Sequence, residues 1–557
     1  MMFTPENRND CPKPNVSRTN LIRIWFILAT VFAVFKAGGA TNWYVSPDGN
    51  NSLASDHGRS HEKPLRTIAY AFNQAAEPGD TVFVMNGTYR NDGFGTGSIN
   101  NGPVAFLNSS GTLHMPIVLT NMPGHQPIIE FDGAGGLTAG QIEHIEISGF
   151  TIIGPAEHIT TEQAMAHRLD LPKPNYYNGR GIAIWGPASH VTIKHNTVSY
   201  APGSGIRVNK GDYLNISHNL IFNNCWYTSA AESALVIAEA QSIDDLDSIK
   251  IIIENNQVWG NQNKIPFFTA NPPSIGVPNY GAENQDYIID GSGVYMTRNK
   301  EYETGWFYLA NNISFNNGIN GLVVHRTDRA IVVNNTSYMN GATPLESGRQ
   351  SSSGITLNNA SHVKVFNNIS YARYPEDFAL GQYGTLHDIE LEANIIFNGF
   401  TPFDSGYLVA NPLFVHADTI KQTADFSLQP NSPAINQGVL NQWVPPTDYL
   451  GNPRGDTPDI GALEYVDPVF LHKISIESIE ARVFPNPAVD VVHIDLHNKH
   501  LNGMVSVWDI HGRQIYHTTL HAGEGNLAID VSAWSRGVYL IKISSDTSHT
   551  TKKITVL

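Results

Sequence analysis

A short phrase recurs along the middle of the chain, and it constrains the fold more than any other feature. Each copy has an apolar run, one or two asparagines, and a second apolar run that ends near Asn or Gly. The shortest step between neighbouring copies occurs twice, from Asn196 to Asn219 and from Asn312 to Asn335. The longer steps look like this one with an insertion, which is typical of a solenoid of stacked repeats. The copies are centred on His195-Asn196, His218-Asn219, Asn255-Asn256, Asn311-Asn312, Asn334-Asn335, Asn367-Asn368 and Ala393-Asn394.

Each repeat divides into three short runs of β-forming residues between polar turns, for example residues 205–208, 213–217 and 220–222. Such runs predict coils of three strands rather than pairs of helices. We therefore predict an all-β chain built as a parallel β-helix, right-handed like other parallel crossovers. Asparagine adopts left-handed turns easily, and stacked amides can bond from coil to coil. We interpret the recurring asparagines as scaffold.

The N-terminus carries the order of features found in a secretory signal. Arg18 and Arg23 precede an apolar run at residues 24–35, and small residues follow at 37–40. We predict export with cleavage after Ala40. The alternative is a membrane anchor, but the run is short for a spanning helix, which needs about 20 residues.

The mature chain would keep one cysteine, Cys225, and therefore no internal disulfide. Residues 64–76 have helical apolar spacing and would cap the open N-terminal end of the solenoid. With residues 43–49 and 79–89 they resemble the opening of secreted β-helix proteins of the pectate-lyase-like superfamily. Residues 432–465 resemble the closing segment of many such proteins.

The last part of the chain has its own pattern of alternating strands joined by glycine turns, which predicts a small β-sandwich. Its motifs lie at residues 484–487, 507–513, 537–543 and 552–557. They strongly resemble the C-terminal sorting domain of type IX secretion cargo. The resemblance implies a partnership with the type IX machinery, passage through an outer membrane, and then release or surface attachment. We expect four parts: a signal peptide (1–40), a β-helix with an N-terminal cap (41–465), a linker (466–480) and the sorting domain (481–557).

Composition narrows the function classes. The formal net charge is -16, and charged residues make up only 15% of the chain. An acidic chain is a poor partner for nucleic acid, because phosphate binding needs a basic face. The low charge fraction suits an extracellular β-rich protein. We expect a secreted or surface-attached monomer that does not bind nucleic acid.

Two long insertions point to one groove. Residues 225–232 and 261–290 both fall between the third strand of one coil and the first strand of the next. Insertions that leave the same edge wall a groove over one stacked sheet. The first strands then form its floor. They are residues 181–184, 205–208, 233–236, 293–296, 321–324 and 354–357.

Side chains alternate along a strand, so the third and fifth residues of each floor strand point outward and the sixth begins the next turn. The third residues are Ala183, Arg207, Leu235, Tyr295, Val323 and Thr356. The fifth are Trp185, Asn209, Ile237, Thr297, His325 and Asn358. The sixth are Gly186, Lys210, Ala238, Arg298, Arg326 and Asn359. This alignment predicts a basic strip on an acidic protein, bordered by the carboxylates Glu232, Glu239, Glu283, Asp286 and Asp290.

A groove of this kind suits a uronate-containing polysaccharide, and the matching chemistry is β-elimination. Neutralising the uronate carboxylate stabilises the carbanion-like transition state, and a base removes the neighbouring proton. Lys210 and His325 are the candidate bases, and Arg207, Arg298 and Arg326 are the candidate neutralisers. The candidate calcium ligands are Glu232, Glu239, Asp286 and Asp290, since calcium prefers oxygen ligands. The candidates for stacking on sugar rings are Trp185, Tyr295, Trp226 and Tyr227.

Two other functions remain open. A glycoside hydrolase would use two carboxylates that flank the bond, from Glu232, Glu239, Asp286 and Asp290. A surface-displayed glycan-binding or adhesive protein would use the groove without turnover. No lyase family's catalytic set can be carried over whole onto these residues. The resemblance therefore predicts the fold and not the activity.

Overall fold

The structure is a computed structural model that describes residues 40–53, 56–268, 287–344, 352–420, 423–467, 481–496, 503–509, 514–521, 526–545 and 549–557. Of the predicted signal peptide only Ala40 is described, and most of the predicted linker also lies outside these ranges. Among the described residues, no helix has the length and apolar character needed to cross a membrane.

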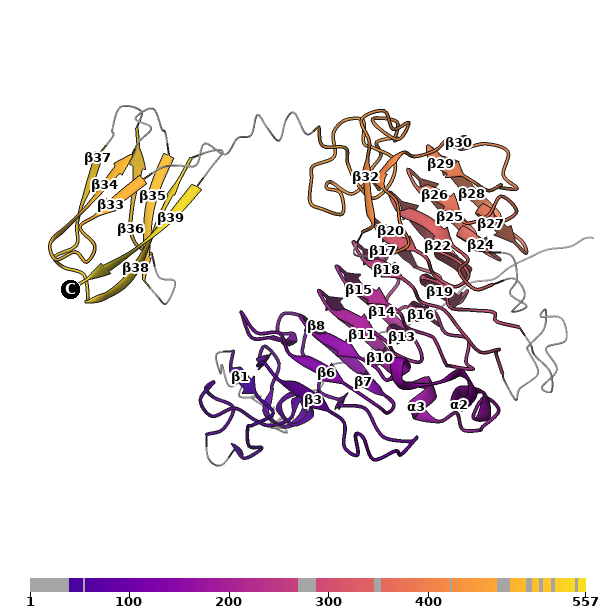
Figure 1. Ribbon diagram of the computed structural model, residues 1–557, viewed down its shortest axis with the longest axis horizontal. Coiled ribbons are helices and arrows are strands. Elements are labelled where there is room, and N and C mark those ends of the chain that lie inside the picture. Colours follow the sequence, from indigo (N-terminus) through magenta and orange to yellow (C-terminus); the bar gives the residue numbers. More distant parts are fainter. Residues whose placement is uncertain are drawn as a thin grey trace, which may run out of the picture.

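The predicted parallel β-helix is present, and Figure 1 shows its coils stacked in chain order. Each full coil contributes one strand to each of three parallel sheets, here named I, II and III. Sheet I contains β4 (Ala105–Leu107), β7 (Gly135–Ala139), β10 (Arg180–Ile184), β13 (Ile206–Asn209), β16 (Leu235–Ala238), β19 (Val294–Asn299), the first part of β22 (Leu322–Val333), β24 (Ser353–Asn358) and β27 (Phe378–Tyr383).

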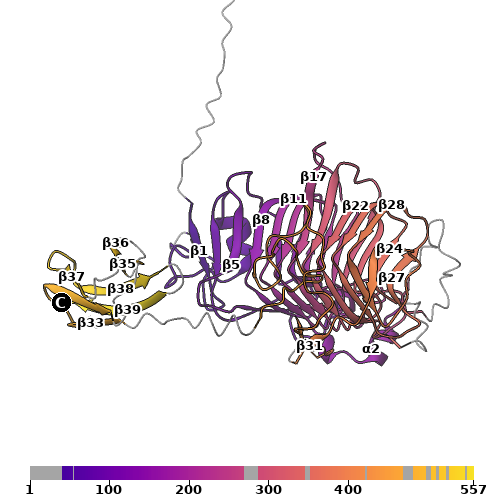
Figure 2. The same cartoon turned by 90° about the horizontal axis from the view of Figure 1, so that it is seen from above.

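Sheet II follows sheet I along each coil, and β22 runs through both without a break. Figure 2 shows the strands of the stack side by side. Sheet II contains β1 (Asn42–Val45), β2 (Thr81–Val84), β5 (Ile117–Asn121), β8 (Ile142–Ser148), β11 (Ala188–Lys194), β14 (Gly211–Ser217), β17 (Ser248–Glu254), β20 (Gly305–Ala310), the end of β22, β25 (Ser361–Phe366) and β28 (His387–Glu392).

Sheet III closes each coil with short strands. They are β3 (Thr88–Arg90), β6 (Ile128–Glu130), β9 (Thr151–Ile153), β12 (Thr197–Ser199), β15 (Leu220–Phe222), β18 (Gln257–Trp259), β21 (Ile313–Phe315), β23 (Thr336–Asn340), β26 (Ile369–Ala372), β29 (Asn394–Phe397) and β30 (Tyr407–Val409). The inward residues of the three sheets form one continuous apolar core. One column of it contains Ile182, Ile206, Leu235, Val294 and Leu322, all fully buried.

The recurring asparagines form the predicted ladder at the turn between sheets II and III. The first residue of each pair has a left-handed backbone, with φ of 53° at Asn311 and 52° at Asn334. The second residue is buried and donates its amide to the next coil, for example Asn256 Nδ2 to Asn312 Oδ1 at 3.1 Å. A second ladder, which the sequence analysis missed, joins Asn224 to Asn261 at 3.0 Å. Buried amides that bond one another in this way fix the register of the coils.

The helices are few and short. The predicted N-terminal helix is present as α1 (Ile68–Tyr70) and a π-helix, η2 (Ala71–Ala75), which buries Phe72 in the core beside the first strands. Three more lie together between β9 and β10. They are the 3₁₀-helix η3 (Ala156–His158), α2 (Thr161–Ala166) and α3 (Asn175–Asn178).

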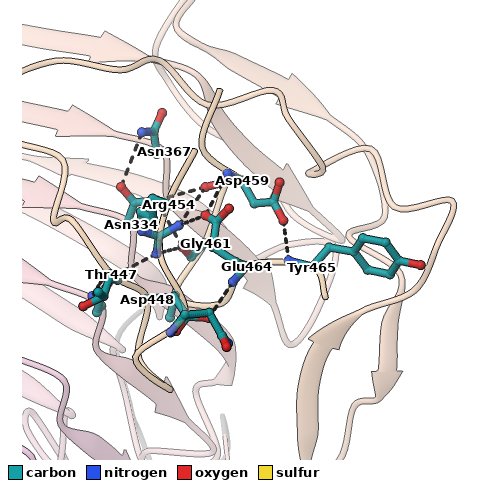
Figure 3. A network of polar contacts seen from close by, with 12 residues as sticks. Asn334, Asn367, Thr447, Asp448, Arg454, Asp459, Gly461, Glu464 and Tyr465 are labelled. Atoms are coloured by element: carbon teal, nitrogen blue, oxygen red, sulfur yellow. Dashed lines mark hydrogen bonds and ion pairs between the residues drawn. The ribbon is translucent and has the colours of Figure 1, made fainter. Parts of the chain in front are cut away.

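Residues 414–465 run back along the outside of the last coils, and their polar network is shown in Figure 3. The network centres on the buried Arg454, which pairs with Glu464 and donates from Nη2 to Asn311 Oδ1 at 2.9 Å. Asn334 donates to the Asp459 carbonyl at 3.0 Å. The outer asparagines of the turn thus hold this segment, which includes the hairpin β31 (Phe414–His416) and β32 (Asp425–Leu428).

The C-terminal domain has its own core and two antiparallel sheets, as predicted for a small β-sandwich. One sheet contains β33 (Ala481–Phe484), β34 (Val491–Leu496) and β37 (Asn526–Asp530). The other contains β35 (Gly503–Asp509), β36 (Gln514–Leu520), β38 (Gly537–Ser544) and β39 (His549–Val556).

Candidate functional site

The long insertions lie where the sequence predicted them, between a strand of sheet III and the next strand of sheet I. Residues 223–234 connect β15 to β16, and residues 260–293 connect β18 to β19. A third insertion, residues 154–179 between β9 and β10, carries the three helices and was not predicted. All three border the edge of sheet I at which its strands begin, so the outer face of sheet I is the candidate site.

The register of sheet I corrects one coil of the predicted alignment. Arg207 pairs with Val236 rather than with Leu235, and Asn209 pairs with Ala238 rather than with Ile237. Leu235 and Ile237 therefore face the core, and both are fully buried. The turn position that follows belongs to Glu239 instead of Ala238, beside Lys210 in one neighbouring coil and Arg298 in the other.

A buried charge cluster lies at the edge of sheet I where the strands begin. Glu232, which is 2% exposed, accepts hydrogen bonds from Arg180 Nε at 3.0 Å and from Arg207 Nη1 at 2.9 Å. The hydroxyl of Ser204 donates to the same carboxylate. Two guanidinium groups thus share one carboxylate and leave one positive charge in excess. Arg207 and Glu232 were predicted from the sequence, whereas Arg180, which occupies the position before the aligned strand, was not.

The two carboxylates at this edge have very different pKa values. Burial alone would raise the pKa of Glu232, but Arg180 and Arg207 lower it to about 2. Burial and the charge of Glu232 raise the pKa of Asp290 to about 7, against the hydrogen bond from Ser233, which lowers it. Glu232 is therefore ionised and Asp290 is partly protonated at neutral pH.

His325 lies farther along the strands, on the same outer face. Its Nδ1 is 2.9 Å from Thr297 Oγ1 and 3.1 Å from the Tyr295 hydroxyl. Burial, together with the positive charges of Arg326 and Arg298, lowers the pKa of His325 to about 4. Burial also raises the pKa of Tyr295 well above its usual value. The imidazole is thus neutral and the phenol protonated over the whole neutral range.

The third group of residues lines a hollow of about 490 Å³ at the edge where the strands of sheet I end. Its cations include Lys210, Arg298 and Arg326, and its carboxylates are Glu239 and Glu301. Lys300 also lines it. The walls thus hold four cations against two carboxylates, on a chain whose net charge is -16. A local excess of positive charge attracts anionic groups.

The residues of the predicted basic strip therefore do not form one continuous surface on sheet I. Lys210, Arg298 and Arg326 share the hollow, whereas Arg207 occupies the same strand position as Tyr295 and its guanidinium group reaches back to Glu232 at the opposite edge. Tyr295 lies in register with Arg207, and His325 lies next to the turn that carries Arg326, so the two side chains stand between the carboxylate Glu232 and the hollow, and the charges of Arg298 and Arg326 act on both. The outer face of sheet I thus carries two cationic edges and a neutral acid–base pair in the middle.

The four predicted stacking residues have different surroundings. Trp185 is 39% exposed, and the guanidinium group of Arg180 lies 4.8 Å from its ring centroid. Tyr295 is partly buried against His325. Trp226 and Tyr227 pack among the insertions, and Lys264 Nζ lies 3.1 Å from the Trp226 ring centroid. Trp185 is the most exposed residue of this set, and it lies beside the cationic cluster.

The predicted calcium ligands do not come together as a cation cage within the part of the chain that the structure describes. No group of three or more His, Cys, Asp or Glu side chains among these residues has an arrangement suited to a metal. Glu232 is bound by two arginines, and Glu239 pairs with Arg298. Asp286, like Glu283, lies outside the described residues. The described carboxylates therefore do not fit a calcium ion.

Comparisons with known proteins agree with the fold. Residues 138–337 match the family described as right handed beta helix region, and residues 482–557 match the secretion system C-terminal sorting domain. The chain is therefore a right-handed β-helix protein that carries a type IX secretion sorting domain, which confirms the resemblance seen in the sequence. No curated protein matches.

Three solved structures illustrate the likeness of fold. A lacto-N-biosidase from Eubacterium ramulus is 12% identical with a TM-score of 0.36, over 64% of this chain and 57% of that one. An alginate lyase from Paenibacillus sp. is 15% identical with a TM-score of 0.30, over 58% and 96%. The A-module of a mannuronan C-5 epimerase from Azotobacter vinelandii is 12% identical with a TM-score of 0.27, over 62% and 93%. Similarity at this level carries no inference about activity.

Proposed function

We propose that this protein is a polysaccharide lyase that cleaves a uronate-containing polysaccharide by β-elimination on the outer face of sheet I. The observation that carries the proposal is the pair His325 and Tyr295, 3.1 Å apart, between two cationic edges. Elimination needs a base that is unprotonated at neutral pH and an acid that is protonated there. The lowered pKa of His325 and the raised pKa of Tyr295 supply these two states.

The cationic edges supply the second requirement, neutralisation of the uronate carboxylate. Arg180 and Arg207 leave one positive charge in excess over Glu232, next to the exposed Trp185. On the other side, Lys210 and Arg326 line the hollow. A guanidinium or ammonium group paired with a uronate carboxylate stabilises negative charge as it develops on the neighbouring carbon.

The proposed step balances without a co-reactant. His325 takes the proton from the carbon next to the carboxylate, the bond from the next carbon to the glycosidic oxygen breaks, and a carbon–carbon double bond forms. Tyr295 gives its proton to the leaving oxygen and recovers the Nδ1 proton of His325 across their contact. His325 is then left with the abstracted proton on Nε2, and proton exchange with water restores the starting tautomer. When Nδ1 carries the imidazole hydrogen and donates to Thr297, Nε2 holds the lone pair that accepts the proton. Lys210 was the other candidate base, and its place in the hollow fits carboxylate binding instead.

A glycoside hydrolase is the second candidate, and one observation favours it. Asp290, with its pKa of about 7, has the proton affinity of a general acid, next to the ionised Glu232. A nucleophile or base must present a free oxygen, however, and Glu232 already accepts from Arg180, Arg207 and Ser204. The lyase is therefore the better supported function.

The match to the sorting domain supports an extracellular site of action for the proposed activity. We propose that the signal peptide directs export and that the sorting domain carries the protein across the outer membrane. The β-helix would then act on extracellular polysaccharide, as a monomer released from or attached to the surface. Binding without turnover is the third possible function and is decided by the same assay.

The assay incubates the protein with pectate, alginate, glucuronan and glycosaminoglycans, with and without added Ca²⁺, and follows the ultraviolet absorbance of unsaturated products. We expect absorbing products from at least one polymer and none from the same polymer with the His325→Ala variant. Reducing ends without absorbing products would establish a hydrolase. Retention on a polymer with neither signal would establish a binding protein.

A further inference from the structure

The turn that follows sheet I carries charged residues where its backbone favours glycine or asparagine. The φ angles are 53° at Lys210, 57° at Glu239, 58° at Arg298 and 46° at Arg326. Long side chains seldom adopt this left-handed conformation, because the Cβ atom crowds the backbone there. Other coils use Gly186, Asn359 and Gly384 at the same position. Four successive coils therefore keep a charged side chain at this edge against the preference of the backbone.

The order of charges along these four coils is not uniform. Register pairs Lys210, Glu239, Arg298 and Arg326 from coil to coil, so one carboxylate interrupts a row of cations. Glu239 accepts from Arg298 Nε at 3.0 Å and lies 2.9 Å from Arg298 Nη2. Both side chains are partly exposed, at 39% and 47%. The row therefore presents one cation, a neutral pair, and a second cation.

The free cations are separated by the neutral pair. Lys210 and Arg326 stand three coils apart, which is about 14 Å at the usual strand spacing. Neither cation is paired with a carboxylate in the part of the chain that the structure describes. A ligand carboxylate placed beside Glu239 would meet a like charge, and it would find Arg298 already occupied. A hydroxyl or amide hydrogen placed there can donate to Glu239 instead.

From this order of charges, and resting on the lyase function proposed above, we infer that Glu239 is a specificity-determining residue. It selects polysaccharides in which uronates are separated by uncharged sugars over polymers with a carboxylate on every residue. The contribution is partly repulsive, since selectivity can come from disfavouring the wrong ligand. Chondroitin, with alternating uronate and N-acetylated sugar, represents the preferred class. Polyguluronate and pectate represent the other.

The test compares binding of the three polymers by the full chain, using affinity electrophoresis at fixed ionic strength. We expect the wild type to bind chondroitin more tightly than pectate or polyguluronate. The Glu239→Gln variant should bind the homopolymers several-fold more tightly and chondroitin no more tightly, because Arg298 is released. Glu303→Gln is the matched control. It removes the same charge from an exposed residue of the neighbouring connection that does not line the hollow.

The possible outcomes distinguish a failure of this inference from a failure of the proposed lyase function. If no polymer yields unsaturated products but the binding order changes in Glu239→Gln, the lyase proposal fails while the role of Glu239 in selecting ligands stands. If the protein is a lyase and prefers homopolymers, or if Glu303→Gln changes the binding order as much as Glu239→Gln, the inference about Glu239 is overturned.

Discussion

The imidazole of His325 lies 3.1 Å from the hydroxyl of Tyr295, and the two side chains come from adjacent coils of sheet I. Thr297, which lies in the same coil as Tyr295, places its Oγ1 2.9 Å from the same imidazole nitrogen and helps to orient the ring. Burial and the nearby arginines keep the imidazole neutral. A neutral base beside a protonated phenol, on a face with two cationic edges, is the arrangement on which the proposed reaction depends.

Removing either member of this pair is expected to abolish turnover without abolishing binding. The variants His325→Ala and Tyr295→Phe should each lose about 10²–10⁴-fold in kcat, the usual contribution of a positioned acid or base. Retention of either variant on an immobilised substrate should stay near the wild-type value. A variant that keeps its activity would show that the group it removes has no part in the reaction.

The pH profile of the proposed reaction should depend on Arg326. The base acts when His325 is unprotonated, so kcat is expected to rise with pH through a pKa of about 4 and then level off. The charge of Arg326 contributes to lowering the pKa of His325, and Arg326→Gln should therefore raise this pKa. The acid limb of the profile would move to higher pH. An unchanged acid limb would mean that another group acts as the base.

Glu232 should be important for folding as well as for charge balance. In Glu232→Gln the buried Arg207 and the partly buried Arg180 lose the carboxylate that they share, and breaking a buried ion pair typically costs about 3–5 kcal/mol. Glu239→Gln removes a partly exposed pair, for which about 0–1 kcal/mol is expected. Chemical denaturation of both variants measures the difference. Equal effects would contradict the account of the buried cluster.

Asp290 should make the β-helix less stable as the pH rises. Its folded-state pKa of about 7 lies above the usual value, so the native state binds more protons than the unfolded chain between about pH 4 and 7. Stability contributed by this proton is present below that window and is lost as the pH rises through it. Asp290→Asn, which keeps a polar partner for Ser233, should remove this dependence. Thermal unfolding at pH 5 and pH 8 measures it.

Arg454 is expected to hold residues 414–465 against the last coils. Its guanidinium group pairs with Glu464 and binds Asn311, as Figure 3 shows for the surrounding network. Arg454→Met would leave buried carboxylates without their cation, and the segment should become sensitive to limited proteolysis. Arg329→Met, which removes the pair with the largely exposed Asp247, is the control. Cleavage at the same rate in both variants would contradict this role.

Much of the fold could be predicted because the physical causes are local. At every turn of the ladder a residue with a left-handed backbone is followed by a buried asparagine. Both positions favour particular residue types, as at Asn311 and Asn312, so the turns can be recognised in the sequence. The edge that carries the insertions also followed from their position in the repeat. The insertion at residues 154–179 was missed because it lies before the first copy of the phrase that was used to count coils.

The site was less predictable because it depends on which residues of each strand point outward and on contacts between residues far apart in the sequence. The stretch Leu235–Ala238 is buried at every position, so its sequence has no alternation from which the phase could be read. The error of one residue placed Ala238 where Glu239 stands. Arg180 and Glu232 are separated by 52 residues, and only the folded coil brings them together. Trp226 is covered by Lys264 from another insertion, which no local pattern indicates.

The central claim is that the polymer is cleaved by elimination, and one measurement tests it most directly. A polysaccharide that the protein cleaves is digested in water labelled with heavy oxygen, and the masses of the products are measured by mass spectrometry. The account predicts products with a carbon–carbon double bond and no label from water, and no cleavage by His325→Ala. Incorporation of one labelled oxygen for each bond cleaved would contradict it.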